Sequence, residues 1–287
     1  MKKIILSAAL AAVPASAAPS APSYETYAGL YARLMGGATA AQLEDVLPGL
    51  SANLKTAGEV SAKYWTDSTP YDELAKAFLL PDPALDALGI RHESTGGVVH
   101  VPAGIMHTYG YLFSQLKTAY GLKGKRWIES RIDERLGLPA GTFGPLAPQG
   151  EFASNVTVAL LRLLGERAKL PHAAKLKLSD KPAGFVEQKV EWKTPDGKTE
   201  KASVFTHLVA LKPLPGFETA DAYLLIYSVV RGRERRLVTA FPVDEKFAGS
   251  IRKTASGKSA SFVPRFNLYV DPAWTVVAQD NLGFIAR

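Results

Sequence analysis

The sequence predicts an α+β protein, in which a helical first half precedes a second half that forms a mainly antiparallel sheet. In the first half, apolar residues recur at spacings of three and four, as on one face of a helix. From about residue 183 the spacing changes to two, as in half-buried strands. Because a run of helices precedes a run of strands, the order favours the α+β class over alternating α/β folds.

Glycine and proline residues separate the predicted helices, which cover residues 24–35, 40–52, 60–79 and 127–136. The run 137–150 is rich in proline and glycine and predicts a long loop. After it, the pair Ser154-Asn155 is expected to cap an apolar helix that continues through Leu164.

The first predicted strand lies within residues 90–101, where Gly96, Gly97 and several β-branched residues indicate a turn followed by a strand. In the second half, Val186, Val190 and Trp192 alternate with charged or polar residues before a Pro-Asp-Gly-Lys turn, which favours a hairpin. Further strands are predicted at residues 203–211, 222–230, 236–243, 262–270 and 275–278, with a short helix at 244–253.

Residues 1–17 have the three parts of a secretory signal peptide: Lys2 and Lys3, an apolar stretch, and an Ala-x-Ala site ending at Ala17. The apolar stretch is shorter than the roughly 20 residues of a membrane-spanning helix. We therefore expect export to the periplasm or the outside of the cell, a flexible mature N-terminus at residues 18–23, and no stable membrane insertion after cleavage.

The mature chain divides into a helix-rich region, residues 24–172, and a β-rich region, residues 183–287. The stretch around residues 170–182 is the best internal boundary. The sequence is equally compatible with one fused core and with two independent domains. About 270 residues are enough for either arrangement.

The chain contains no cysteine, which excludes disulfides, thiolate metal sites, cysteine nucleophiles and a lipoprotein anchor. The formal charge of +7 becomes +5 when Lys2 and Lys3 leave with the signal peptide. A positive charge of this size is compatible with an anionic small molecule or polymer as partner, including nucleic acid, and equally with plain solubility. The sequence has no Gly-x-Ser-x-Gly, His-Glu-x-x-His or Cys-x-x-Cys signature.

Three of the five histidines lie close together in the sequence, at His92, His100 and His107. Gly104 and Gly110 flank the last of them, an arrangement that lets backbone approach a ligand. We interpret His100 and His107 as candidate base and acid, with His92 beside them. Further candidates from the same cluster are Tyr109 and Tyr111 for substrate binding, and His207 if its strand turns it towards the helical half. Glu93 is the carboxylate nearest to the histidines and is a candidate for orienting one of them or for acting as an acid.

The run from Gly96 through Pro102 and Gly104 to His107 resembles the second short motif of the cupin barrels. In cupins the histidine at that position is a metal ligand, so the resemblance implies a histidine-bound divalent metal. The similarity covers about a dozen residues. The first cupin motif, a His-x-His followed by Glu, has no counterpart upstream, and no family is assigned.

The segment from Tyr120 to Trp127 combines positive charge with aromatic rings. Lys123 is a candidate for stabilising a developing anion. The candidates for binding a base, sugar or other anionic group are Tyr120, Lys125, Arg126 and Trp127. The alternative interpretation of this segment is a basic surface loop before a helix. A second basic cluster, residues 231–236, is expected at a solvated hairpin turn.

These features predict an exported hydrolase or lyase that uses its histidine cluster on an anionic substrate. A non-catalytic binding protein of the envelope or the extracellular space is the alternative. Clustered titratable groups favour the enzyme, since a binding module has no particular need for them.

Overall fold

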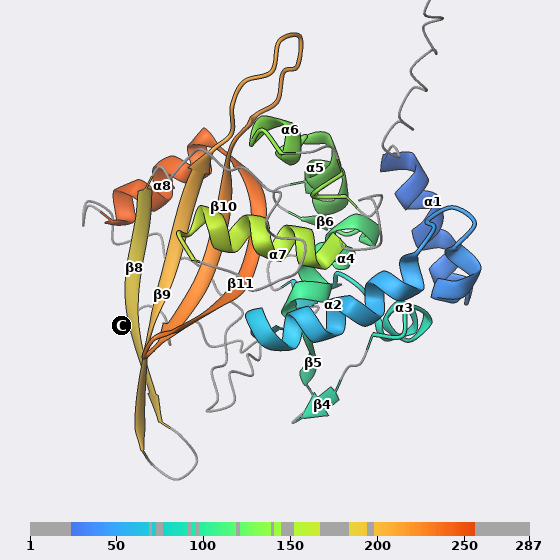
Figure 1. The fold of residues 1–287 in the computed structure, drawn as a ribbon, viewed down its shortest axis with the longest axis horizontal. Coiled ribbons are helices and arrows are strands. Elements are labelled where there is room, and N and C mark those ends of the chain that lie inside the picture. Colours follow the sequence, from blue (N-terminus) through green and yellow to red (C-terminus); the bar gives the residue numbers. More distant parts are fainter. Residues whose placement is uncertain are drawn as a thin grey trace, which may run out of the picture.

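The computed structural model describes residues 24–68, 71–72, 77–90, 93–95, 98–118, 121–138, 141–144, 152–166, 184–193 and 198–255. Within these ranges helices dominate the first part and an antiparallel sheet the second, so the predicted α+β class is confirmed (Figure 1). The predicted signal peptide and the strand candidates at 262–270 and 275–278 lie outside the described residues.

The first predicted helix is confirmed as α1 (Tyr24–Met35), whereas the helix predicted at residues 40–52 is wrong. In its place are a short 3₁₀ helix, η1 (Ala40–Leu43), and the first turn of α2 (Leu50–Tyr64). Pro48 and Gly49 separate the two, and Gly49 has a φ of 81°, which places it in the left-handed region that glycine tolerates.

The helix predicted at residues 60–79 is also wrong beyond Tyr64, because the chain becomes extended at Trp65. The backbone N–H of Thr66 donates to the carbonyl of Leu237 at 2.9 Å, so this segment pairs with the distant sheet instead of continuing the helix. Short strands follow at β1 (Asp67–Ser68), β2 (Tyr71–Asp72) and β3 (Ala77–Phe78), and then the helix α3 (Asp82–Ala87).

The predicted turn and strand within residues 90–101 correspond to β4 (Glu93–Thr95) and β5 (Val98–Pro102), which pair antiparallel. Strand β5 lies between β1 and β4 in a three-stranded sheet and leads directly into α4 (Ala103–Phe113). The strands β6 (Lys117–Thr118) and β7 (Gly121–Leu122) form a small hairpin before the next helix.

The helix predicted at residues 127–136 is two shorter helices, α5 (Lys123–Glu129) and α6 (Ile132–Arg135). They are separated at Arg131, whose φ of 46° is incompatible with a continuous right-handed helix. Helix α7 (Phe152–Leu163) begins before Ser154, so Ser154-Asn155 lies inside the helix and the predicted cap is wrong.

The second half forms a four-stranded antiparallel sheet in the order β11-β10-β9-β8. The strands are β8 (Gly184–Lys193), β9 (Thr199–Ala210), β10 (Asp221–Arg231) and β11 (Glu234–Asp244), followed by the helix α8 (Glu245–Ala255). Asp244 accepts a hydrogen bond from the backbone N–H of Phe247 at 2.7 Å and so caps α8.

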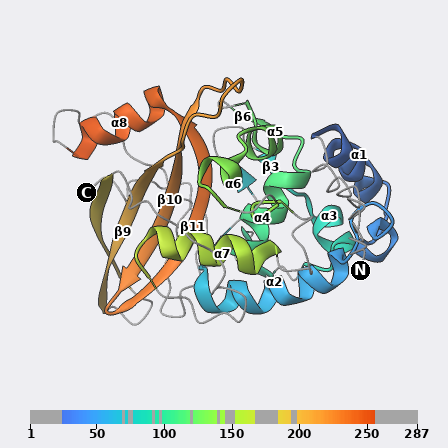
Figure 2. The ribbon, with the colours of Figure 1, turned by 45° about the horizontal axis from the view of Figure 1, so that its top comes forward.

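Helices cover both faces of this sheet (Figure 2). On one face, Val209, Ile226 and Leu237 join the core that α2, α4 and α7 supply. On the other face, Phe247 of α8 packs against Phe241 at a ring-centroid distance of 6.2 Å. A single buried cluster therefore includes residues of the helix-rich and the β-rich regions. None of the described helices is long and apolar enough to cross a membrane.

Candidate functional site

The β4–β5 hairpin brings two of the residues singled out in the sequence to the same register position. Glu93 and His100 are Cα partners, and the next pairs are Ser94 with Val99 and Thr95 with Val98. Residues that are directly opposite on antiparallel strands are the closest pairs a sheet offers, with Cβ atoms about 4.5–5.5 Å apart. The backbone thus places a carboxylate residue opposite a histidine residue.

His107 lies in α4, the helix that follows β5 without an intervening loop. Strand β5 is fixed on its other side by β1, where Asp67 is the Cα partner of Pro102. His100 and His107 therefore belong to one continuous strand-helix unit. His92 and Tyr120 lie outside the described residues, and Tyr111 lies in α4.

Gly104 allows close packing of α4 on α2. A Cβ atom at Gly104 would lie 2.4 Å from Ser61 Oγ and 2.9 Å from Trp65 Cδ1, so no larger residue fits without movement. The atoms that approach Gly104 closely thus belong to Ser61 of α2 and to Trp65. From the sequence, a ligand was predicted to approach the backbone here. Trp65 is itself held by a hydrogen bond from Nε1 to Thr157 Oγ1 at 2.8 Å.

Tyr109 lies in the core and packs edge-on against Phe152, with ring centroids 5.2 Å apart. Its burial raises the pKa of the hydroxyl above the ordinary value. In this structure its ring therefore contributes to packing of α4, and its role in binding a substrate stays a prediction.

The basic and aromatic segment ends in α5, where its members have different environments. Trp127 is buried and donates from Nε1 to the carbonyl of Phe143 at 2.8 Å. Lys125 is exposed, with Nζ 3.7 Å from Glu129 Oε1. Lys123, half-buried, is the first residue of the helix. The rings and charges of this segment thus do not form a common platform among the described side chains.

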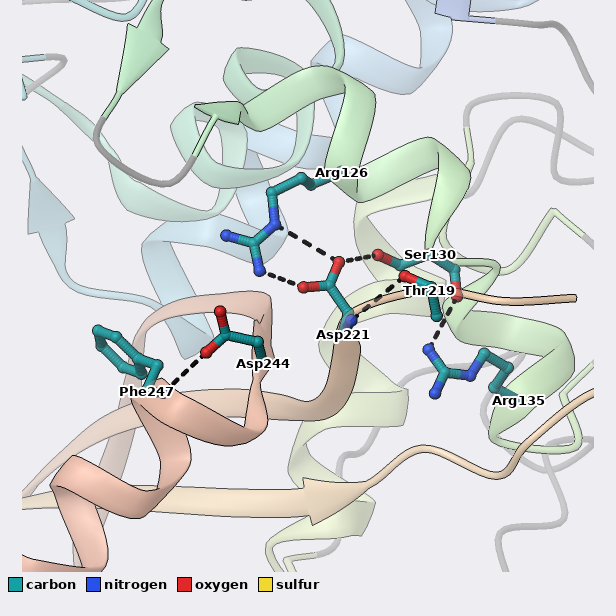
Figure 3. A network of polar contacts seen from close by, with 7 residues as sticks. All are labelled: Arg126, Ser130, Arg135, Thr219, Asp221, Asp244 and Phe247. Atoms are coloured by element: carbon teal, nitrogen blue, oxygen red, sulfur yellow. Dashed lines mark hydrogen bonds and ion pairs between the residues drawn. The ribbon is translucent and has the colours of Figure 1, made fainter.

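Arg126 belongs to a partly buried polar network with Asp221, the first residue of β10 (Figure 3). Its guanidinium forms an ion pair with the Asp221 carboxylate, which also accepts a hydrogen bond from Ser130 Oγ at 2.6 Å. The backbone N–H of Asp221 donates to Thr219 Oγ1 at 3.2 Å. Arg126 thus joins the helical half to the sheet.

Arg135 extends this network from α6 (Figure 3). It donates to the carbonyls of Lys212 at 2.9 Å and Leu211 at 3.3 Å, and is 4% exposed. Its burial lowers the pKa of the guanidinium, an effect that the charge of Asp221 opposes. We call Arg126, Ser130, Arg135 and Asp221 the joint. No local pattern in the sequence indicated it, because Arg126 and Asp221 are 95 positions apart.

His207 is buried in β9 as the Cα partner of Ile226, so it lies on the face of the sheet that the main core covers. Its ring stacks on Phe205 at 5.9 Å, and the Arg235 guanidinium lies 4.8 Å from the Phe205 ring. Burial, followed by the nearby charge of Arg235, lowers the pKa of His207 to about 4. The imidazole is therefore neutral at pH 7.

The basic cluster at residues 231–236 lies at the β10–β11 hairpin, as expected. Arg233 is exposed, whereas Arg235 pairs with Glu166 at 3.0 Å and donates to Ser228 Oγ at 2.7 Å. Arg236 donates to the carbonyl of Ala62 in α2 at 3.4 Å, so part of the cluster contacts the helical half.

Among the described residues, no three His, Asp or Glu side chains gather as a possible metal site. Comparison of the chain with family models, curated proteins and solved structures finds no match.

Proposed function

We propose that the chain is an exported hydrolase or lyase in which His100 and His107 act as general base and general acid on an anionic substrate. The observation that supports this most directly is the register of the β4–β5 hairpin, with Glu93 opposite His100. A carboxylate that accepts a hydrogen bond from one imidazole nitrogen fixes the tautomer and raises the basicity of the other. Glu93 is the positioning residue in this proposal.

The direct succession of strand β5 and helix α4 also supports the proposal. Strand β5 ends at Pro102 and α4 begins at Ala103, so His107 follows His100 on regular structure with no loop between. The close packing at Gly104 holds α4 against α2. Acid and base groups that are carried by rigid elements keep the geometry that proton transfer requires.

The anionic nature of the substrate is inferred from charge. The mature chain carries a formal charge of +5, and Lys123 begins α5, a helix that packs against α4. A cation near the histidines would stabilise the negative charge that develops when an ester bond breaks or a carbon acid loses its proton. The signal peptide at residues 1–17 supports export.

The proposal is tested with mature protein on a panel of anionic substrates: phosphomonoesters, phosphodiesters, RNA and uronic acid polysaccharides. The variants are His100→Gln and His107→Gln, and the matched control is His172→Gln, which is distant from the cluster in the sequence. We expect each cluster variant to lose about 10²–10⁴-fold in turnover on the substrate that is cleaved, while the control keeps its turnover. Unchanged turnover in both cluster variants would refute the proposal.

Metal analysis separates acid–base catalysis from a histidine-bound metal. Elemental analysis of the untagged mature protein and of the His100→Ala/His107→Ala double variant is expected to find no stoichiometric metal in either. Stoichiometric metal in the wild type that is lost in the double variant would replace the acid–base proposal with metal-assisted chemistry.

Binding of an anionic polymer without turnover of any substrate would favour the non-catalytic alternative.

A further inference from the structure

The two edges of the main sheet differ. At the β11 edge, Trp65 forms a parallel bridge with Leu237, and Thr66 donates from its backbone N–H to the Leu237 carbonyl. At the opposite edge, β8 pairs with β9 over all ten of its residues and with no other strand in the described part of the chain (Figure 1). A strand edge of this length presents a row of backbone donors and acceptors to another chain.

The charges on β8 follow a regular pattern. Alternate positions carry Glu187, Lys189, Glu191 and Lys193, so negative and positive residues follow each other on one face of the strand. Edge strands that do not pair with another chain are commonly protected by charged residues, especially lysine. A strand with alternating signs is complementary to an antiparallel copy of itself.

The register of such a self-pairing follows from symmetry. Residues directly opposite each other in an antiparallel pair lie on the same face of the sheet. When the two strands are identical copies, the two-fold axis that relates them therefore passes beside a residue that lies opposite its own copy. When Val190 is that residue, Glu187 faces Lys193 and Lys189 faces Glu191, and every charged position of the face meets the opposite sign. Registers centred on Lys189 or Glu191 bring like charges together.

We propose that two copies of the chain pair antiparallel through their β8 edges, centred on Val190, and form one continuous sheet across the dimer. Main-chain hydrogen bonds between the edges supply the pairing, as in other cases of strand addition. The opposite charges set the register, because each opposite-charge pair across neighbouring strands is favourable and each like-charge pair is not. Among the described residues, the helices lie on the two faces of the sheet and no strand pairs with the outer edge of β8, so this edge is where the two sheets would meet.

Sedimentation velocity of the mature wild-type protein, from micromolar to near-millimolar concentration, tests the proposal. The wild type is expected to dimerise. Lys193→Glu places two like-charge pairs across the axis and is expected to weaken the dimer about tenfold. The double variant Glu187→Lys/Lys193→Glu restores opposite charges at the same positions and is expected to recover the wild-type affinity.

Lys55→Glu is the matched control, since it makes the same change of charge at an exposed position on α2 and leaves the dimer unchanged. Circular dichroism checks that each variant is folded. If Lys193→Glu does not fold, Glu187→Lys introduces the equivalent repulsion and takes its place. A wild type that is monomeric at every concentration overturns the proposal. The same monomeric result is expected if residues 262–270 of the same chain pair with β8. A dimer that Lys193→Glu and Glu187→Lys do not weaken also overturns it.

Discussion

The joint and the β4–β5–α4 unit both contain charged or titratable residues that the sequence singled out, but they are assembled differently. In the joint, Arg126 and Ser130 meet Asp221 from a distant part of the chain, and the contacts link the helical half to the sheet. In the hairpin unit, Glu93 and His100 are paired within one hairpin. The long-range contacts of the joint are accounted for by folding, because they link the two halves of the chain, whereas the local pairing is the arrangement on which the proposed chemistry rests.

The largest expected effect is the loss of the Asp221 carboxylate. Asp221→Ala leaves Arg126 in a partly buried site without its ion-pair partner and is expected to lower the free energy of unfolding by about 3–5 kcal/mol. Urea denaturation measures it. Asp45→Ala removes an exposed ion pair with Arg33 and is expected to cost under about 1 kcal/mol. Equal losses in the two variants would show that the joint is not a structural network.

The next effect concerns pH and the buried histidine of the sheet. Because the folded-state pKa of His207 is about 4 and the ordinary value is 6.5, only the unfolded chain takes up this proton between those values. The contribution of His207 to stability is complete above pH 6.5 and is lost as the pH falls towards 4, by roughly 2–3 kcal/mol.

Denaturation curves of the wild type and of His207→Leu between pH 4.5 and 7.5 check this pH dependence. The wild type is expected to lose more stability than the variant as the pH falls. Parallel pH dependence in the two proteins would mean that His207 is protonated as easily in the folded state as in the unfolded state.

The smallest effect is at the contact between α4 and α2. Gly104→Ala places a Cβ atom against Ser61 and Trp65 and is expected to destabilise the protein by about 1–2 kcal/mol. Gly29→Ala in α1, where nothing lies within 4 Å of the added atom, is expected to stabilise it by about 0.5–1 kcal/mol. Thermal unfolding of the two variants compares them, and a tolerated Gly104→Ala would mean that α4 is not held as closely as the fold indicates.

Sequence patterns predicted elements that depend on local periodicity and missed those that depend on distant partners. Helix α1 and the strands of the main sheet were recognised from their spacing. The helix predicted at residues 60–79 failed because Thr66 bonds to Leu237, a contact that no local pattern reveals.

The candidate site follows the same rule. Glu93 was predicted to be the carboxylate nearest to the histidines, and the hairpin makes it the register partner of His100. Trp127 was predicted to bind a base, sugar or other anionic group because of its basic neighbours, but it is buried against Phe143. The sequence predicted the loop that contains Phe143 and did not reveal this contact. Tyr109 was predicted to bind a substrate because tyrosine combines a large apolar ring with a polar group. The same apolar ring also packs well in a core, which is where the structure places it.

An NMR pH titration of the His100 imidazole in the wild type and in Glu93→Gln tests the proposed interaction of the two side chains. We expect the variant to lower the pKa of His100, because the neutral amide no longer stabilises the imidazolium. An identical His100 titration in the two proteins would show that the Glu93 carboxylate does not act on His100, and would contradict the proposed acid–base site.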